Sequence, residues 1–171
     1  MNKKLAYFLG VMHDAHIIYR KSVSQYGFEI EQKNKKFAEY LATLIDQLFG
    51  IKPRLELRKR SWGNYWRLRI YSKKIYKEII KYDFKDLLKS ESKQIKRELI
   101  RGFYDAEGSV SSDEVRMFNK DTKLLGIIKK VISEEFGLKL GKIVVSKDDV
   151  FQLPLYAKLE QRKFMEIFKP V

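Results

Sequence analysis

Two acidic residues follow two apolar segments that each contain a glycine. Asp14 lies four residues after Gly10, and Glu107 lies five residues after Gly102. Glycine inside a helix costs about 1 kcal/mol relative to alanine, so we expect these glycines to mark a close approach of two helices. Packed side by side, the helices would bring both carboxylates to the negative ends of their dipoles, where a divalent cation such as Mg²⁺ relieves the repulsion. The alternative is a buried helix pair whose acids point into solvent.

The composition excludes several other kinds of site. The chain has 171 residues, no cysteine and only two histidines, His13 and His16. A disulfide scaffold, a cysteine-ligated zinc site and a thiol nucleophile are therefore excluded. The 36 Lys and Arg residues against 22 Asp and Glu residues give a net charge of +14, which predicts a polyanionic partner, and nucleic acid is the commonest one.

The sequence contains the same unit twice. The paired landmarks are Gly10 with Gly102, Asn34-Lys35 with Asn119-Lys120, and Phe49-Gly50 with Phe136-Gly137. A duplication predicts two pseudo-symmetric halves in one chain, residues 1–88 and 89–171. The polar segment 83–93 is the expected link between them.

Hydrophobic periodicity predicts the elements of each half. Helices are expected over residues 37–48 and 124–136, ended by Gly50 and Gly137. Strand pairs are expected at 55–60 with 65–71 and at 142–147 with 151–158, with turns at 62–64 and 147–149. Each half then has the order αββαββα, and the fold class is α+β.

The first strand pair is strongly basic. Residues 52–74 contain nine Lys or Arg residues and one acid, Glu56. Alternation along the strand places Arg67, Arg69 and Tyr71 on one face. Such a ribbon fits the major groove, where arginine reads guanine edges and lysine neutralises phosphates. The alternative is a solvated basic face that has no partner.

Residues 99–108, LIRGFYDAEG, resemble the LAGLIDADG motif, and residues 5–16, LAYFLGVMHDAH, resemble a diverged first copy of it. With the duplication, these motifs make the chain similar to single-chain, two-motif LAGLIDADG homing endonucleases of the archaeal intron-encoded type. The resemblance implies two saddle-shaped antiparallel sheets that bind a long, asymmetric site in double-stranded DNA. It also implies a monomer that acts as a pseudo-dimer and hydrolyses phosphodiester bonds with Mg²⁺ or Mn²⁺.

The resemblance further implies roles for individual residues. Metal contacts are expected from Asp14, Glu107 and the backbone carbonyl of Ala106. The expected catalytic residues are Asp14, Glu107, Gln32, Lys33 and Lys120. The expected DNA contacts are Tyr19, Arg20, Lys21, Glu31, Arg54, Arg58, Lys59, Arg60, Trp62, Arg67, Arg69, Tyr71, Arg116, Asn119, Lys142, Lys147 and Gln152.

The first motif departs from the family pattern. Asp14 lies one residue closer to its glycine than Glu107 does, and Ala15 and His16 stand where the family has its second acid and glycine. One missing residue rotates a helical side chain by ~100°. Either the helix ends early and a turn delivers Asp14, or the first site is compromised. The second case favours a catalytically inactive RNA-splicing maturase, with intron RNA as partner, or a DNA-binding protein of the same fold.

The N-terminal apolar run is not expected to be a signal peptide. Gly10 interrupts it, His13 and Asp14 end it, and no small-residue cleavage site follows. No segment approaches the ~20 apolar residues that a bilayer-spanning helix needs. We therefore expect a cytoplasmic prokaryotic protein, archaeal in type, with no membrane partner.

Overall fold

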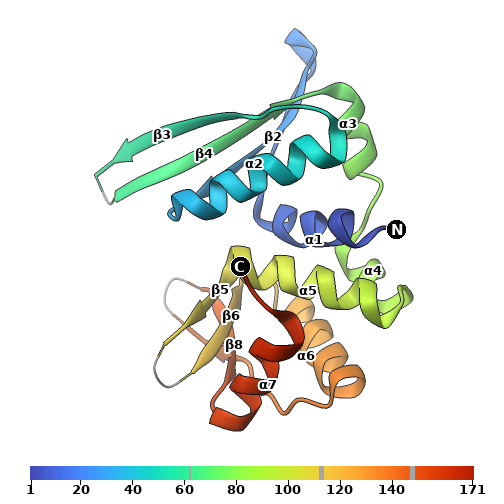
Figure 1. Ribbon diagram of the computed structural model, residues 1–171, viewed down its shortest axis with the longest axis vertical. Helices are drawn as coiled ribbons and strands as arrows, with labels where there is room; N and C mark the ends of the chain where they lie inside the picture. The colour runs from blue at the N-terminus through green and yellow to red at the C-terminus, as the bar shows by residue number, and fades with distance from the viewer. Residues whose placement is uncertain (62, 112–113, 147–148) are drawn as a thin grey trace. The chain divides into compact units, whose positions relative to one another are not determined.

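Two compact units make up the computed structural model (Figure 1). It describes residues 1–61, 63–111, 114–146 and 149–171, and of Asp14 only the backbone. One unit is Met12–Tyr82, and the other combines Met1–Val11 with Asp83–Val171. This division follows packing, whereas the expected halves, 1–88 and 89–171, follow the duplication in the sequence.

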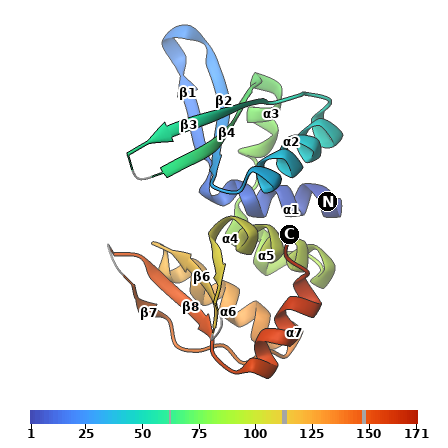
Figure 2. The ribbon, with the colours of Figure 1, turned by 60° about the vertical axis from the view of Figure 1, so that its left-hand side comes forward.

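The Met12–Tyr82 unit is built on a four-stranded antiparallel sheet, here called sheet A, with strand order β1-β2-β4-β3. Its elements are η1 (Met12–Asp14), β1 (His16–Arg20), η2 (Lys21–Val23), β2 (Gln25–Gln32), α2 (Lys35–Phe49), β3 (Arg54–Arg60), β4 (Gly63–Tyr71) and α3 (Lys73–Ile79). Helices α2 and α3 pack on one face of the sheet and bury Phe28, Ile30, Leu68 and Ile70 (Figure 2). The other face carries charged side chains.

The second unit contains a second four-stranded antiparallel sheet, sheet B, with strand order β5-β6-β8-β7. Its elements are α1 (Lys3–Val11), α4 (Phe84–Ser90), α5 (Lys93–Glu107), β5 (Gly108–Val110), β6 (Val115–Asn119), α6 (Thr122–Phe136), β7 (Val144–Val145), β8 (Phe151–Leu155) and α7 (Lys158–Phe168). Val115, Met117, Leu153 and Leu155 form the buried face of the sheet. The order αββαββα is therefore found twice, as the sequence predicts.

Helices α1 and α5 pack with their backbones in contact. A Cβ atom on Gly10 would overlap the carbonyl oxygen of Leu99, and a Cβ atom on Gly102 would overlap that of Tyr7. Only glycine permits so close an approach. The close helix pair predicted from these two glycines is confirmed.

The two long helices that follow the first strand pairs have matching ends. Asn34 caps α2 by accepting the N–H of Phe37, and Asp121 caps α6 by accepting the N–H of Leu124. Gly50 and Gly137 end them in the left-handed region, at φ +64° and +70°. The predicted helices are confirmed, but Asn34 corresponds to Asp121 rather than to Asn119.

The structure adds a helix to the expected link, and it gives two other elements different bounds from those expected. The link between halves contains helix α4, which Asp83 caps and whose Leu88 is fully buried. Gly63 and Asn64, expected in a turn, pair with Arg60 and Lys59 as part of β4. Strand β8 ends at Leu155, and Lys158 begins α7. In the described part of the chain, no helix has the length and apolarity to cross a bilayer.

Candidate nucleic-acid interface and catalytic residues

The register of sheet A brings charged side chains onto the face that α2 and α3 leave uncovered. Arg69 lies opposite Glu29 in β2 and Arg54 in β3, while Arg67 lies opposite Glu31 and Glu56. Since side chains two residues apart share a face, Arg67, Arg69 and Tyr71 project to the same side. The predicted alternation is confirmed.

Five of these side chains form an Arg–Glu network, made of Arg54, Arg67, Arg69, Glu29 and Glu56. Arg67 donates to Glu56 at 2.7 Å and lies 3.4 Å from Glu29, and Arg69 donates its Nε–H to Glu29 at 2.9 Å. The Arg67 hydrogen bond lowers the pKa of Glu56, and the bond to Glu29 raises the pKa of Arg69. Both shifts favour the charged forms of Glu56 and Arg69.

Arg67 differs from the other basic residues of this face. Its side chain is only 5% exposed, although the sequence predicts that it projects from the sheet together with Arg69. The carboxylates of Glu29 and Glu56 flank it and compensate its charge. Arg67 therefore lies beneath the surface in the unbound chain, because the carboxylates of Glu29 and Glu56 hold it there.

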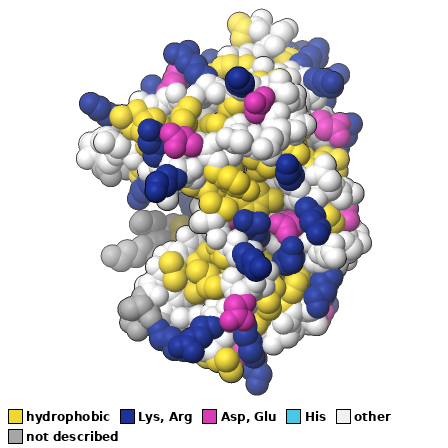
Figure 3. Space-filling model, viewed as in Figure 1, with side chains coloured by type: hydrophobic (Ala, Val, Ile, Leu, Met, Phe, Trp, Pro, Cys, Tyr) yellow, Lys and Arg dark blue, Asp and Glu magenta, His cyan; other side chains and the backbone are white. Residues whose placement is uncertain are grey.

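Exposed arginines lie on the open face of sheet A, both within the network and beside it. Arg20, Arg54 and Arg58 are exposed on the same face, and Arg60 binds Glu31 at 2.7 Å. In Figure 3, basic side chains outnumber acidic ones over the face that is visible. A polyanion that approaches sheet A would meet these arginines first.

Some expected DNA contacts lie elsewhere. Lys59 alternates with Arg58 and Arg60 and so projects to the opposite face. The Tyr19 ring lies on that helix-covered face, at 6.1 Å from the Tyr76 ring of α3. Exposed Lys21 belongs to η2 rather than to a strand. Trp62 and Lys147 lie outside the described residues.

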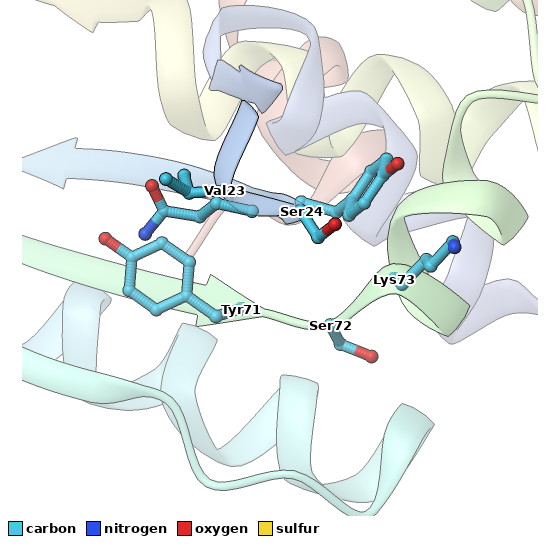
Figure 4. Close-up of a pocket in the computed structure, with 7 residues that line it drawn as sticks. Val23, Ser24, Tyr71, Ser72 and Lys73 are labelled. Atoms are coloured by element: carbon cyan, nitrogen blue, oxygen red, sulfur yellow. The ribbon is translucent and has the colours of Figure 1, made fainter. Parts of the chain in front are cut away.

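Two hollows adjoin on sheet A. The first is lined by His16, Arg20, Gln25, Glu29, Arg67, Arg69 and Tyr71, together with Ile17, Ile18 and Tyr19. The second lies at the end of β4, where Tyr71, Ser72 and Lys73 line it together with Val23 and Ser24 from the β1–β2 connection (Figure 4). Gln25 and Tyr71 line both hollows, which therefore adjoin at the end of the strand.

Sheet B presents a different face. Arg116 pairs with Pro154 and Phe118 with Gln152, which places all four on the side away from the core. The charge of Arg116 is compensated by an ion pair with Glu114. Lys142 is exposed just before β7, and Asn119 ends β6. This face carries less charge than that of sheet A in the described residues.

The two predicted metal-binding acids lie at unlike helix ends. Glu107 is the last residue of α5, where the carbonyl of Ala106 also lies in the final turn and has no donor further along the helix. Helix α1 ends at Val11, and the 3₁₀ turn Met12–Asp14 follows, with the Ala15 N–H bonded to the Met12 oxygen at 3.0 Å. Of the two alternatives for the short first motif, the helix does end early. The pairing of the two carboxylates stays a prediction.

The remaining catalytic candidates occupy matching positions in the two units. Gln32 ends β2 and Asn119 ends β6, while Lys33 and Lys120 each immediately precede a helix cap. The Lys33 Nζ lies 5.7 Å from the centre of the Tyr65 ring. This correspondence supports the equivalence of the two lysines.

Asp105 is an acid that the sequence prediction did not single out. It accepts the Tyr7 hydroxyl of α1 at 2.7 Å and the Val171 N–H at 3.0 Å. Burial raises the pKa of Asp105 to about 6, against the effect of these hydrogen bonds. Burial also raises the pKa of the neighbouring Tyr104 to about 12. Asp105 therefore links α5 to α1. Its position two residues before Glu107 was the feature of the sequence that could have identified it.

The donor chemistry at the motif ends suits a hard cation. Two carboxylates and a backbone carbonyl, from Asp14, Glu107 and Ala106, are the oxygen ligands that Mg²⁺ prefers. Among the side chains that the structure describes, no group of three or more His, Asp or Glu residues forms a metal site by itself.

Known proteins share both the sequence pattern and the fold. Residues 94–169 match the LAGLIDADG-like domain family. The Uncharacterized protein MJ0398 from Methanocaldococcus jannaschii is 28% identical over 94% of this chain, and the chain spans 64% of that relative's length.

Two solved structures have similar folds. The homing endonuclease I-DmoI in complex with DNA and Mn has a TM-score of 0.75 and 24% identity, over 99% of this chain and 98% of that one. Full-length DUF199/WhiA from Thermatoga maritima has a TM-score of 0.74 and 12% identity, over 99% of this chain and 56% of that one. Residues 94–169 therefore resemble a LAGLIDADG-like domain, and the chain as a whole shares the twofold αββαββα fold of the I-DmoI structure.

Proposed function

We propose that this protein is a metal-dependent endonuclease that recognises a long, asymmetric site in double-stranded DNA. The observation that carries the proposal is the backbone contact of α1 with α5 at Gly10 and Gly102, with Glu107 at the end of α5. A protein that only binds DNA has no need to hold an acid at the end of such a helix pair. The I-DmoI structures with DNA and Mn or with DNA and Ca support both partners.

The roles of the residues follow from their chemistry. Asp14, Glu107 and the Ala106 carbonyl would hold Mg²⁺ or Mn²⁺, which when bound supplies a water of lowered pKa and stabilises the leaving 3′ oxygen. Lys33 and Lys120 would hold negative charge on the scissile phosphates, and Gln32 would orient the attacking water. The exposed arginines of sheet A would bind the flanking duplex. The duplication within one chain supports a monomer that acts as a pseudo-dimer.

The alternative is a DNA-binding protein or an RNA-splicing maturase that has lost catalysis. It would hold if the 3₁₀ turn Met12–Asp14 does not deliver the Asp14 carboxylate to the metal, since Glu107 in the second motif lies at the end of an α-helix instead. Under this alternative the basic face would bind nucleic acid, intron RNA included, and the acids would have no catalytic role.

The two functions are separated by incubating the full chain with a plasmid library of randomised sites and Mg²⁺, then sequencing any cut ends. We expect discrete ends with wild type, none in EDTA, and at least a hundredfold loss with Glu107→Gln, which keeps the shape but loses the charge that holds the metal. Glu134→Gln, an exposed change in α6, should cut like wild type. Binding without cleavage in Mg²⁺ would establish the alternative.

A further inference from the structure

The open face of sheet A contains carboxylates where a phosphate-binding face would have none. Glu29, Glu31 and Glu56 lie among its arginines, and the Glu29 side chain is still 18% exposed. A carboxylate beside DNA repels phosphates, and so lowers the affinity for duplex of any sequence. A carboxylate on this face must therefore contribute to selectivity between DNA sequences rather than to affinity.

Glu29 and Arg69 form a paired acceptor and donor at the hollow in this face. Both line the hollow, with Gln25 and Tyr71 at its edge. Arg69 donates its Nε–H to Glu29, so this bond uses neither of the two terminal nitrogens of the guanidinium, of which Nη1 lies 3.8 Å from a Glu56 oxygen. In the major groove, arginine donates to guanine O6 and N7, and glutamate accepts from cytosine N4.

We propose that Glu29 and Arg69 together read the major-groove edge of one G·C base pair at this hollow, and that Arg67 is a positioning residue for Glu29. The inference rests on the proposed binding of duplex DNA. It adds Glu29 to the residues that determine sequence specificity and removes Arg67 from those that touch a base.

The role of Arg67 follows from its burial. It lies between Glu29 and Glu56, and its buried Nε has no hydrogen-bond partner among the described residues. From this position it holds Glu29 in place before DNA arrives. Such preorganisation lowers the cost of ordering the side chain on binding.

The test is selection of binding sites from a randomised duplex library in EDTA, so that cleavage does not deplete the pool. Wild type should select G·C at one position. At that position, Glu29→Gln should discriminate against A·T about tenfold less than wild type does. Glu29→Gln should bind unselected duplex at least as tightly as wild type does, because the variant lacks one negative charge. Glu39→Gln is the matched control, since exposed Glu39 lies on α2 and pairs with Lys35.

Two other results would overturn the proposal. Glu29→Gln could keep the G·C preference, or it could lose affinity equally for every sequence while remaining folded in a thermal melt. Failure of wild type to bind any duplex would overturn the proposed function as well, so the two failures are distinguishable.

Arg67→Lys tests the positioning role separately. Lysine keeps the charge but cannot bridge two carboxylates with a planar fork. We expect the preference at the same base pair to fall, while the slope of log K against log salt stays that of wild type. An unchanged preference at that base pair, in a variant that remains folded in a thermal melt, would contradict the assignment.

Discussion

Sheet A and sheet B share one strand order but carry different side chains on the faces that their helices leave uncovered. Strands β4 and β3 have nine and seven residues and bear the Arg–Glu network, whereas β8 and β7 have five and two residues, with Phe118 and Gln152 on the corresponding face. The shared topology is maintained by buried residues such as Leu68 and Leu153. Because the outer faces do not contribute to that core, they can diverge, and two unlike faces suit an asymmetric DNA site.

The largest expected difference between the sheets concerns their central arginines. Arg67→Ala should destabilise the fold by about 3 kcal/mol, because it leaves Glu29 and Glu56 without compensation in a mostly buried place. Arg116→Ala removes a side chain that is 35% exposed from its pair with Glu114, and should cost less than about 1 kcal/mol. Urea denaturation of both variants measures the difference. Equal costs would mean that the Arg–Glu network does not stabilise sheet A.

A second contrast lies within the motif helices. Asp105 stands three residues after Gly102, whereas His13 stands three residues after Gly10. Burial raises the pKa of Asp105 from 3.8 to about 6, so folding favours the protonated acid. Its stabilising contribution is complete below the unfolded-state pKa and is lost as the pH rises through about 6.

Asp105→Asn removes this titration but can still accept the Tyr7 hydroxyl. Between about pH 4 and pH 7.5, the stability of the variant relative to wild type should rise by up to about 3 kcal/mol. Urea denaturation in EDTA across this range measures it, without divalent ions near Glu107. A difference that does not change with pH would show that Asp105 titrates normally in the folded chain.

A smaller effect is expected where the two motifs are alike. Gly10→Ala should cost about 2 kcal/mol, because the new methyl group meets the backbone of α5 at Leu99. Gly126→Ala in α6 is the matched control: nothing lies within 4 Å of the added Cβ, and alanine should stabilise the helix by about 0.5–1 kcal/mol. Thermal unfolding of both variants measures whether each substitution lowers or raises the stability. If both variants were stabilised, the close helix contact would be wrong.

The sequence predicted those features that depend on local pattern. Gly50 and Gly137 ended their helices, and Gly10 and Gly102 marked a backbone contact, because these positions tolerate few other residues. Alternation placed Arg67 and Arg69 on one face, but it could not show that Glu29 and Glu56 bury Arg67, since that depends on register between strands distant in the chain. The alternating acids Glu29 and Glu31 were the feature of the sequence that could have indicated acidic partners for these arginines. Helix α4 is short, and tertiary burial of Leu88 stabilises it rather than periodicity.

The account depends most directly on the claim that the exposed arginines of sheet A bind duplex DNA. Fluorescence anisotropy of a random duplex should give a log K that falls steeply with log salt, with a slope of about −0.9 for each neutralised phosphate. Arg58→Gln, on the open face of sheet A, should make the slope shallower by about 0.9, whereas Arg116→Gln, whose charge Glu114 compensates, should leave it nearly unchanged. A wild-type slope near zero, or an equal change in both variants, would contradict the account.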